Sequence, residues 1–218
     1  MPNVPCRFSR SFAFEPAATV LLAIDMQRDF LEDGGYCAAA GDDVSAGQAI
    51  VPRFAAVLAA ARQAGLRVVH TREGYLPDGS DMSALKRERD SAGAPGPLGR
   101  FLIRGEPGQE IVPELTPQPG ETAIDKPGFS AFYRTDLEAL LAEAGITHLI
   151  VMGVTTQCCV HSTLRSAVDR GFRCLTVEDC CAALEPGLHD AAMSLIYGEN
   201  HLFGWVCQSE DLIGALRS

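Results

Sequence analysis

Continuous apolar segments that alternate with segments of helical periodicity are the feature of this sequence that most constrains its fold. The first of them, TVLLAID, has only apolar residues between its opening threonine and its closing aspartate. Such runs are typical of parallel strands buried on both faces, because half-exposed strands alternate apolar and polar residues. We expect strands at residues 19–25, 66–71, 121–126, 147–154 and 173–179, with a sixth at 201–206.

The segments between these strands predict helices. Residues 47–65 repeat apolar side chains at helical spacing and end in a glycine, which is common just beyond a helix. Strands alternating with helices form right-handed βαβ units and a mostly parallel sheet covered on both faces. The sequence therefore predicts a single α/β domain over residues 1–218, with three α/β/α layers and a Rossmann-like sheet of about six strands. Further helices are expected at residues 134–145, 158–171, 187–198 and 209–217.

One segment, at about residues 73–118, interrupts this alternation. It is rich in glycine, proline and charged residues, as in the stretch REGYLPDGSDMSALKRERDSAGAPGPLGRF. Long irregular insertions in compact domains are usually lids, binding loops or interfaces, although some are only surface loops. We expect this insertion to serve as a lid or an interface.

Composition excludes several classes of function. The net charge of -10 argues against a nucleic-acid partner, which would require a basic face. No apolar run reaches the roughly 18 residues of a membrane span, and the start lacks the apolar stretch of a signal peptide. We therefore expect a cytoplasmic protein whose 8 cysteines stay reduced. Their spacing does not match a structural zinc site.

Three groups capable of chemistry follow three of the expected strands. Asp25 ends the first strand, Lys126 ends the third, and GVTTQCC (residues 153–159) follows the fourth. Ligands of open α/β sheets bind beyond the carboxyl ends of the strands, so these groups can converge on one rim. Of the 18 basic residues only Lys86 and Lys126 are lysines, which weakens the interpretation of Lys126 as an ordinary surface lysine.

The adjacent Cys158 and Cys159 open a predicted helix. The helix dipole and the unpaired amides at a helix N-terminus lower the pKa of a thiol and can hold an oxyanion. Helical phase places Cys159 beside the apolar face of this helix and Cys158 on the solvent side. His161 lies only two residues further on and points away, so Asp25 is the better base for the thiol.

The motifs around these residues resemble those of the isochorismatase-like cysteine hydrolases. The resemblance rests on LLAIDMQRDFL (21–31), IDKPGFSAFYRTDL (124–137) and GVTTQCCVHSTLRSAVDRGF (153–172). It extends over nearly the whole chain, and three ordered motifs at matching strand ends make it specific. The resemblance implies a small-molecule hydrolase without a cofactor that assembles as a homo-oligomer, a dimer or a tetramer.

The same resemblance implies roles for individual residues. It assigns a catalytic triad to Asp25, Lys126 and Cys159, the cysteine that helical phase also favours. It further implies a cis peptide at Val154–Thr155 and an oxyanion hole formed by the backbone amides of Thr155 and Cys159. The expected reaction cleaves a C–N bond of a small ureido or amide compound such as biuret and releases ammonia through a thioester.

The substrate pocket is predicted from residues that flank the motifs. These are Gln27, Phe30, Phe132, Tyr133 and Arg72. The alternative substrates are ureidoacrylate or an N-carbamoyl amino acid, whose carboxylate would pair with Arg72 or Arg134. The chain has no histidine between His70 and His148, so the metal motif of nicotinamidases is missing and no metal is expected.

Two other classes of function remain open at this point. A thiol redox protein would use Cys158–Cys159 or Cys180–Cys181 as redox pairs, although neither pair has the C-x-x-C spacing of such proteins. A non-catalytic binding module is the other alternative, and the complete set of Asp25, Lys126 and Cys159 argues against it.

Overall fold

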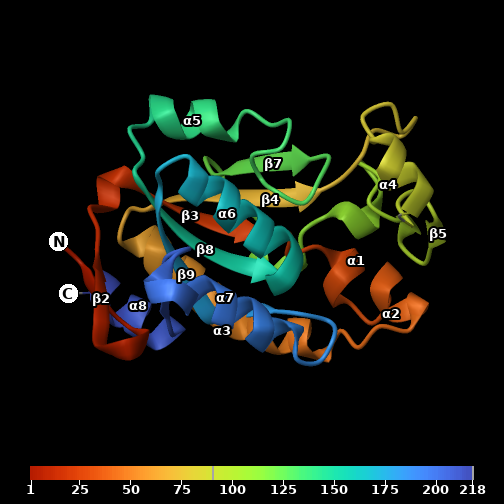
Figure 1. Cartoon of the computed structure of the whole chain (residues 1–218). Coiled ribbons are helices and arrows are strands. Elements are labelled where there is room, and N and C mark those ends of the chain that lie inside the picture. The colour runs from red at the N-terminus through yellow and green to blue at the C-terminus, as the bar shows by residue number, and fades with distance from the viewer. Residues whose placement is uncertain (90, 218) are drawn as a thin grey trace.

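A six-stranded parallel sheet forms the centre of the protein (Figure 1). The structure is a computed structural model that describes residues 1–89 and 91–217. The strand order is β10-β9-β8-β3-β4-β7, and every neighbouring pair is parallel. The strands are β3 (Thr19–Ile24), β4 (Arg67–Glu73), β7 (Thr122–Lys126), β8 (His148–Val154), β9 (Arg173–Ala182) and β10 (Trp205–Cys207). Every residue of the central strand β3 is buried, as its apolar run predicts.

Helices cover both faces of this sheet and complete three layers (Figure 1). On one side lie α3 (Ser45–Gln63) and α8 (Ser209–Arg217), and on the other lie α5 (Leu137–Glu143) and α6 (His161–Asp169). Helix α7 (Leu188–His201) packs against β10 and the segment that precedes α6. In the part of the chain that the structure describes, no helix is long and apolar enough to cross a bilayer.

Smaller elements surround the layered core. An antiparallel hairpin of β1 (Asn3–Cys6) and β2 (Arg10–Ala13) packs on α8 and β10. The short helices α1 (Arg28–Leu31) and α2 (Tyr36–Ala40) follow β3. The insertion contains α4 (Ala84–Arg89), a hairpin of β5 (Pro95–Gly96) and β6 (Gly99–Arg100), and two 3-10 turns. At Pro107–Gln109 and Pro113–Leu115 these turns carry the chain back towards β7.

The predicted α/β class, the three layers and the six-stranded parallel sheet are confirmed. The sixth strand begins later than predicted, because the backbone leaves helical geometry at Gly198, has positive φ from Glu199 to His201, and turns again at Gly204 (φ 122°) before β10. The helix expected from residue 134 begins only at Leu137, since Arg134 has a φ of 53°. Strand β4 runs two residues further than expected and ends at Glu73, so the insertion begins at residue 74 and is partly regular.

Gly153 allows β8 to approach β3 closely at the end of the sheet that carries the candidate site. Its φ is 139°, and a Cβ there would lie 2.1 Å from the carbonyl oxygen of Ile24. The Gly153→Ala variant combines backbone strain with overpacking against a main chain that cannot move aside. We expect it to lower the free energy of unfolding by about 2–5 kcal/mol, measured by urea denaturation.

Gly214 provides the matched control for this substitution. It lies in α8, has no positive φ, and leaves open space around the position that a Cβ would take, with no heavy atom within 4 Å. Gly214→Ala should leave stability unchanged or raise it by about 0.5–1 kcal/mol through helix propensity. Equal urea midpoints for the two variants would contradict the role of Gly153.

Candidate active site

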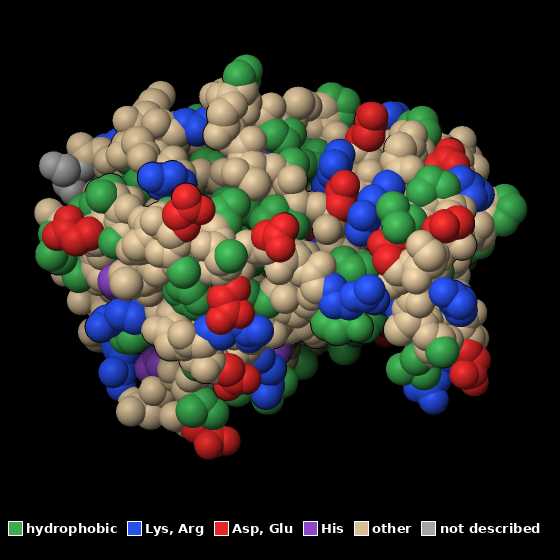
Figure 2. Space-filling model, turned by 90° about the horizontal axis from the view of Figure 1, so that it is seen from above, with side chains coloured by type: hydrophobic (Ala, Val, Ile, Leu, Met, Phe, Trp, Pro, Cys, Tyr) green, Lys and Arg blue, Asp and Glu red, His purple; other side chains and the backbone are tan. Residues whose placement is uncertain are grey.

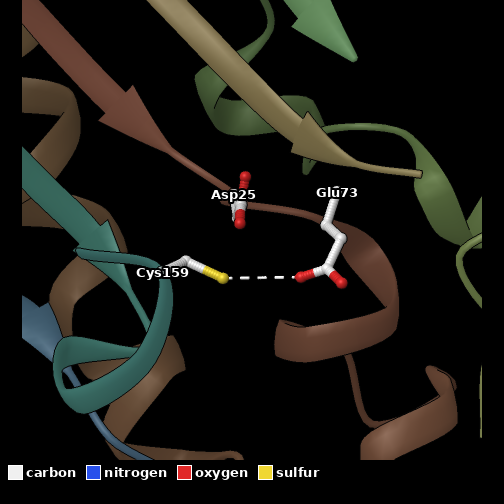
Figure 3. A group of neighbouring side chains, drawn as sticks. All are labelled: Asp25, Glu73 and Cys159. Carbon is white, nitrogen blue, oxygen red and sulfur yellow. Dashed lines mark hydrogen bonds between the residues drawn. The ribbon is translucent and has the colours of Figure 1, made fainter. Parts of the chain in front are cut away.

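Four buried ionisable groups meet at the carboxyl edge of the sheet. Asp25 follows β3, Glu73 ends β4, and Lys126 ends β7. Cys159 comes from the helical turn after β8, and Figure 3 shows its thiol pointing towards the two carboxylates. Parallel strands bring their carboxyl ends to one edge, and the register of β4 against β7 pairs Glu73 with Lys126 directly.

The ammonium of Lys126 lies at the centre of this group. Its Nζ is 2.6 Å from Asp25 Oδ2, 3.7 Å from Glu73 Oε2 and 3.5 Å from Cys159 Sγ. It also donates a hydrogen bond of 2.8 Å to the carbonyl oxygen of Gly128. Asp25 and Lys126 are both 0% exposed, so their charges interact without solvent screening.

Asp25 is held rigidly by its neighbour strand. Its amide donates to the Thr71 carbonyl at 3.1 Å, and its Oδ1 accepts the Thr71 hydroxyl at 2.7 Å. Burial raises the pKa of Asp25, and the charge of Lys126 opposes but does not cancel that rise. Burial lowers the pKa of Lys126, but the negative charge of Asp25 and its neighbours raises it more, so the ammonium stays protonated. A carboxylate with a raised pKa is suited to carry a proton.

Glu73 is a site residue that the sequence pattern did not predict. Cys159 Sγ donates to Glu73 Oε2 at 3.4 Å (Figure 3). Glu73 Oε1 accepts from Tyr75 Oη at 2.9 Å and from Lys86 Nζ at 2.7 Å. Burial raises the pKa of Glu73, but Lys126 and Lys86 lower it more, so this carboxylate stays ionised. The sequence holds one signal for Glu73. If the strand that contains HTRE (residues 70–73) continues to Glu73, it ends level with the neighbouring strand that ends at Lys126.

The turn that carries Cys159 differs from the predicted α-helix start. The peptide bond between Val154 and Thr155 is cis, as the family resemblance implied, and Thr156–Val160 forms a π-helical turn before α6. Cys159 is 4% exposed and faces the site, in agreement with the helical phase. The wider π turn changes the angle of its neighbour, so Cys158 is half-buried and lines the same pocket instead of facing bulk solvent.

The two thiols influence each other directly. The neighbouring thiol of Cys158, together with burial, raises the pKa of Cys159, and the proximity of Cys159 lowers the pKa of Cys158. All 8 cysteines are free, so neither of the redox pairs considered from the sequence is joined. Burial raises the pKa of Cys174, Cys181 and Cys207, which leaves these thiols protonated.

A small pocket of about 140 Å³ opens beside the thiol. It is lined by Phe30, Glu73, Lys86, Phe101, Leu102, Phe129, Thr155, Cys158 and Cys159. A larger cleft of about 590 Å³ between α4 and the segment after β7 adjoins it, and the two share Lys86 and Phe129. Figure 2 shows acidic and basic side chains interspersed over the face seen from above.

Two of the predicted pocket residues contact the site. Phe30 lines the pocket. Gln27 is fully buried and does not line it; its side chain bonds the backbone N–H and C=O of Glu73 at 2.7 and 2.9 Å. Gln27 therefore fixes the backbone of Glu73 at the end of β4 without lining the pocket itself.

The other three predicted pocket residues lie outside the pocket. Tyr133 is 47% exposed and lines only the outer cleft. Phe132 packs against Phe172 in the core. Arg72 bonds Asp125 at 2.8 Å, because successive residues of a strand point to opposite sides and Glu73 takes the side that faces the site.

The described residues contain one cluster with the spacing of metal ligands. Asp25, Glu73 and Cys159 each offer an atom, and these atoms lie within 4.8 Å of one another. The Lys126 ammonium contacts all three groups at 2.6–3.7 Å, so the chain itself supplies the positive charge at that position. This donor set therefore does not fit a resident metal ion.

Comparison with known proteins agrees with this geometry. The family model of the isochorismatase domain matches residues 19–211. The chain belongs to the isochorismatase family. Within this family, ureidoacrylate amidohydrolase RutB of Methylorubrum extorquens (strain DSM 6343 / CIP 106787 / DM4) is 37% identical over 218 residues, covering 94% of this chain and 86% of that protein. RutB of Pantoea ananatis is 34% identical over 206 residues, covering 90% and 81%.

The solved structure of a cysteine hydrolase superposes over the full length of the chain. The cysteine hydrolase from Pseudomonas syringae pv. phaseolicola aligns with a TM-score of 0.83 and 26% identity, covering 100% of this chain and 98% of that chain. The N-carbamoylsarcosine amidase from Thermoplasma acidophilum, at 24% identity and a TM-score of 0.67, shares the fold. The resemblance stated from the three motifs is therefore confirmed at the level of family and fold.

Proposed function

We propose that this protein is a cysteine-dependent amidohydrolase that cleaves a C–N bond of a small ureido compound and releases ammonia. The observation that carries the proposal is the buried contact of one thiol with an Asp–Lys ion pair and a second carboxylate at the wall of a small pocket. Lys126 is within hydrogen-bond reach of both Asp25 and Cys159, and the Asp25 carboxylate and the thiol lie within 4.8 Å of each other. The site thus brings together the nucleophile, base and positioning cation that nucleophilic catalysis requires.

In the proposed reaction Asp25 takes the proton of Cys159, and the thiolate attacks the carbamoyl carbon. The backbone amides of Thr155 and Cys159 stabilise the oxyanion of the tetrahedral intermediate. Protonated Asp25 then gives its proton to the departing nitrogen, which leaves as ammonia. The tetrahedral intermediate collapses to a thioester on Cys159. A water molecule, deprotonated by Asp25, hydrolyses this thioester and regenerates the thiol.

Lys126 supports this cycle at two groups, the Asp25 carboxylate and the Cys159 sulfur. Its ammonium holds Asp25 through a contact of 2.6 Å and prevents burial from protonating that carboxylate permanently. It also contacts Cys159 Sγ at 3.5 Å, where it stabilises the thiolate once the proton has left. No cofactor takes part in these steps, and we expect the enzyme to work as a homo-oligomer, as the family resemblance implies.

Pocket size and charge support a small neutral ureide such as biuret. The pocket measures about 140 Å³, and its charged groups, Glu73 and Lys86, pair with each other at 2.7 Å. A neutral ureide offers N–H donors and carbonyl acceptors to such a pair. Ureidoacrylate is the second candidate, favoured by the name of the relatives that are 34–37% identical. Neither Arg72 nor Arg134 lines the pocket, so an anionic substrate would depend on Lys86.

A direct assay tests the proposed function. We expect kcat/KM for ammonia release from biuret to exceed that for ureidoacrylate, N-carbamoylsarcosine and nicotinamide under one set of conditions. A pocket built to pair with ureide N–H and C=O groups rejects analogues that lack them by factors of up to about 10⁴–10⁵. A tenfold preference for a carboxylate substrate would make the ureidoacrylate alternative correct, and turnover of none of the four would contradict the proposed function.

A further inference from the structure

Glu73 and Lys86 form a buried ion pair in the pocket that the proposed reaction does not use. The carboxylate comes from the end of β4, and the ammonium comes from α4 in the insertion. Their atoms are 2.7 Å apart, and the side chains are only 3% and 12% exposed. Bringing a lysine from the insertion to a buried carboxylate beside the thiol costs desolvation energy, which suggests a function beyond stability.

The Glu73 carboxylate is positioned to accept hydrogen bonds from groups next to the thiol. Its Oε1 is held by Tyr75 and Lys86, while its Oε2 faces Cys159 at 3.4 Å. Once the thiol proton moves to Asp25, Oε2 loses that donor and lies beside the carbon that the sulfur attacks. An ionised carboxylate there accepts N–H bonds and donates none.

Lys86 lies next to Glu73, on the side of the pocket that borders the outer cleft. Its ammonium lies 4.1 Å from the centre of the Phe129 ring, at the boundary between the pocket and the outer cleft. An ammonium carries three N–H donors in a cone, so it can point at a carbonyl oxygen while it stays paired with Glu73. Lys86 and Glu73 thus present a donor and an acceptor to one small molecule.

We propose that Glu73 and Lys86 are the substrate-recognition pair of this site: Glu73 accepts the N–H of the scissile carbamoyl group, and Lys86 donates to the oxygen at the far end of a neutral ureide. This inference rests on the proposed function and names its substrate class. A substrate carboxylate would compete with Glu73 for the same ammonium and leave one of two anions unpaired. The pair therefore selects uncharged ureides and rejects acidic ones.

Lys86→Met tests the far-end contact, with Arg87→Met as the matched control. Arg87 lies on the same helix, is exposed, and donates to the backbone oxygens of Gly79 and Met82, away from the pocket. We expect Lys86→Met to lower kcat/KM for biuret by about 10- to 100-fold, mainly through KM, as for the loss of a charged hydrogen bond. Arg87→Met should stay within about twofold of wild type.

A substrate isostere identifies the atom that Lys86 contacts. N-isopropylurea has the same carbamoyl group as biuret and a similar size, but two methyl groups replace the far carbonyl oxygen and amino group, and of these two only the oxygen would accept a hydrogen bond from an ammonium. As a competitive inhibitor of biuret hydrolysis it should bind wild type and Lys86→Met equally well. If Lys86→Met weakens N-isopropylurea as much as biuret, or impairs N-carbamoylglycine hydrolysis more than biuret hydrolysis, the assignment is wrong.

Glu73→Gln tests the other half of the pair by separating thiol reactivity from turnover. The negative charge of Glu73 raises the pKa of Cys159, so removing it should speed alkylation of Cys159 by iodoacetamide at neutral pH. Turnover of biuret should nevertheless fall by about 100-fold. The amide oxygen of the glutamine stays with its donors Tyr75 and Lys86, so its NH2 group, a donor, replaces the acceptor that faces the scissile N–H. If alkylation and turnover both become slower in Glu73→Gln, the proposal is overturned. That result would mean that Glu73 maintains the structure of the site or acts as the base for the thiol.

Wild-type activity separates this inference from the proposed function. Ammonia release by the wild-type protein is measured first, and an inactive wild type would overturn both. If the wild type hydrolyses biuret while Lys86→Met and Glu73→Gln match it within twofold, the recognition pair fails and the cysteine amidohydrolase stands.

Discussion

Cys159→Ala is expected to reduce ammonia release by about 10⁴-fold or more, to the limit of detection, because it removes the thiol that contacts Lys126 and Glu73 and forms the thioester. Cys158→Ala should keep activity within about tenfold of wild type. Cys158 is half-buried and lines the pocket, but the contacts to Lys126 and Glu73 belong to Cys159. Removing Cys158 also removes a neighbouring thiol that raises the pKa of Cys159, so the remaining thiol should ionise more easily.

Two measurements check this prediction. Steady-state kcat with biuret ranks the two variants, and rapid quenching followed by intact-mass spectrometry should find an acyl adduct on the wild type and on Cys158→Ala but not on Cys159→Ala. Circular dichroism and urea midpoints close to those of the wild type show that the fold is kept. An inactive Cys158→Ala with an active Cys159→Ala would reverse the assignment of the nucleophile.

The positions of Asp25, Lys126 and the cysteine pair could be predicted because they depend on topology. Each follows an apolar run, and a parallel sheet brings the carboxyl ends of its strands to one edge whatever the details of packing. The choice between the two cysteines has a weaker basis in the sequence. It uses the period of an α-helix, whereas Thr156–Val160 is a π turn, and such local windings leave no clear mark in a single sequence.

The pocket wall could not be predicted from motif neighbourhood alone. Arg72 lies beside a strand end, yet the alternation along β4 sends its side chain to Asp125 and turns Glu73 to the site. The scarcity of lysine draws attention to Lys86 in the sequence. Its role depends on how the insertion folds back over β4, a long-range contact that periodicity does not encode.

Asp25→Asn should lower kcat for biuret by about 10³-fold or more, because an amide cannot carry the proton between the thiol, the leaving nitrogen and water. The wild-type pH profile provides the specific readout. Asp25 must be ionised to accept the thiol proton, and its pKa is raised by burial. Activity of the wild type should therefore fall as pH drops, with a limb above the ordinary range of an aspartate, and Asp25→Asn should lack that limb.

Lys126→Met removes the counter-charge of two buried carboxylates, Asp25 and Glu73, and should abolish turnover to a similar extent. It should also lower the free energy of unfolding by about 3–5 kcal/mol, the cost of breaking a buried ion pair from one side. In the double variant Asp25→Asn/Lys126→Met the Asp25 carboxylate is also removed, so fewer buried negative charges lack a partner. The double variant should therefore unfold at a higher urea concentration than Lys126→Met while remaining inactive. If the double variant were the less stable of the two, the Lys126–Asp25 contact of 2.6 Å would not be the interaction that keeps these charges in the core.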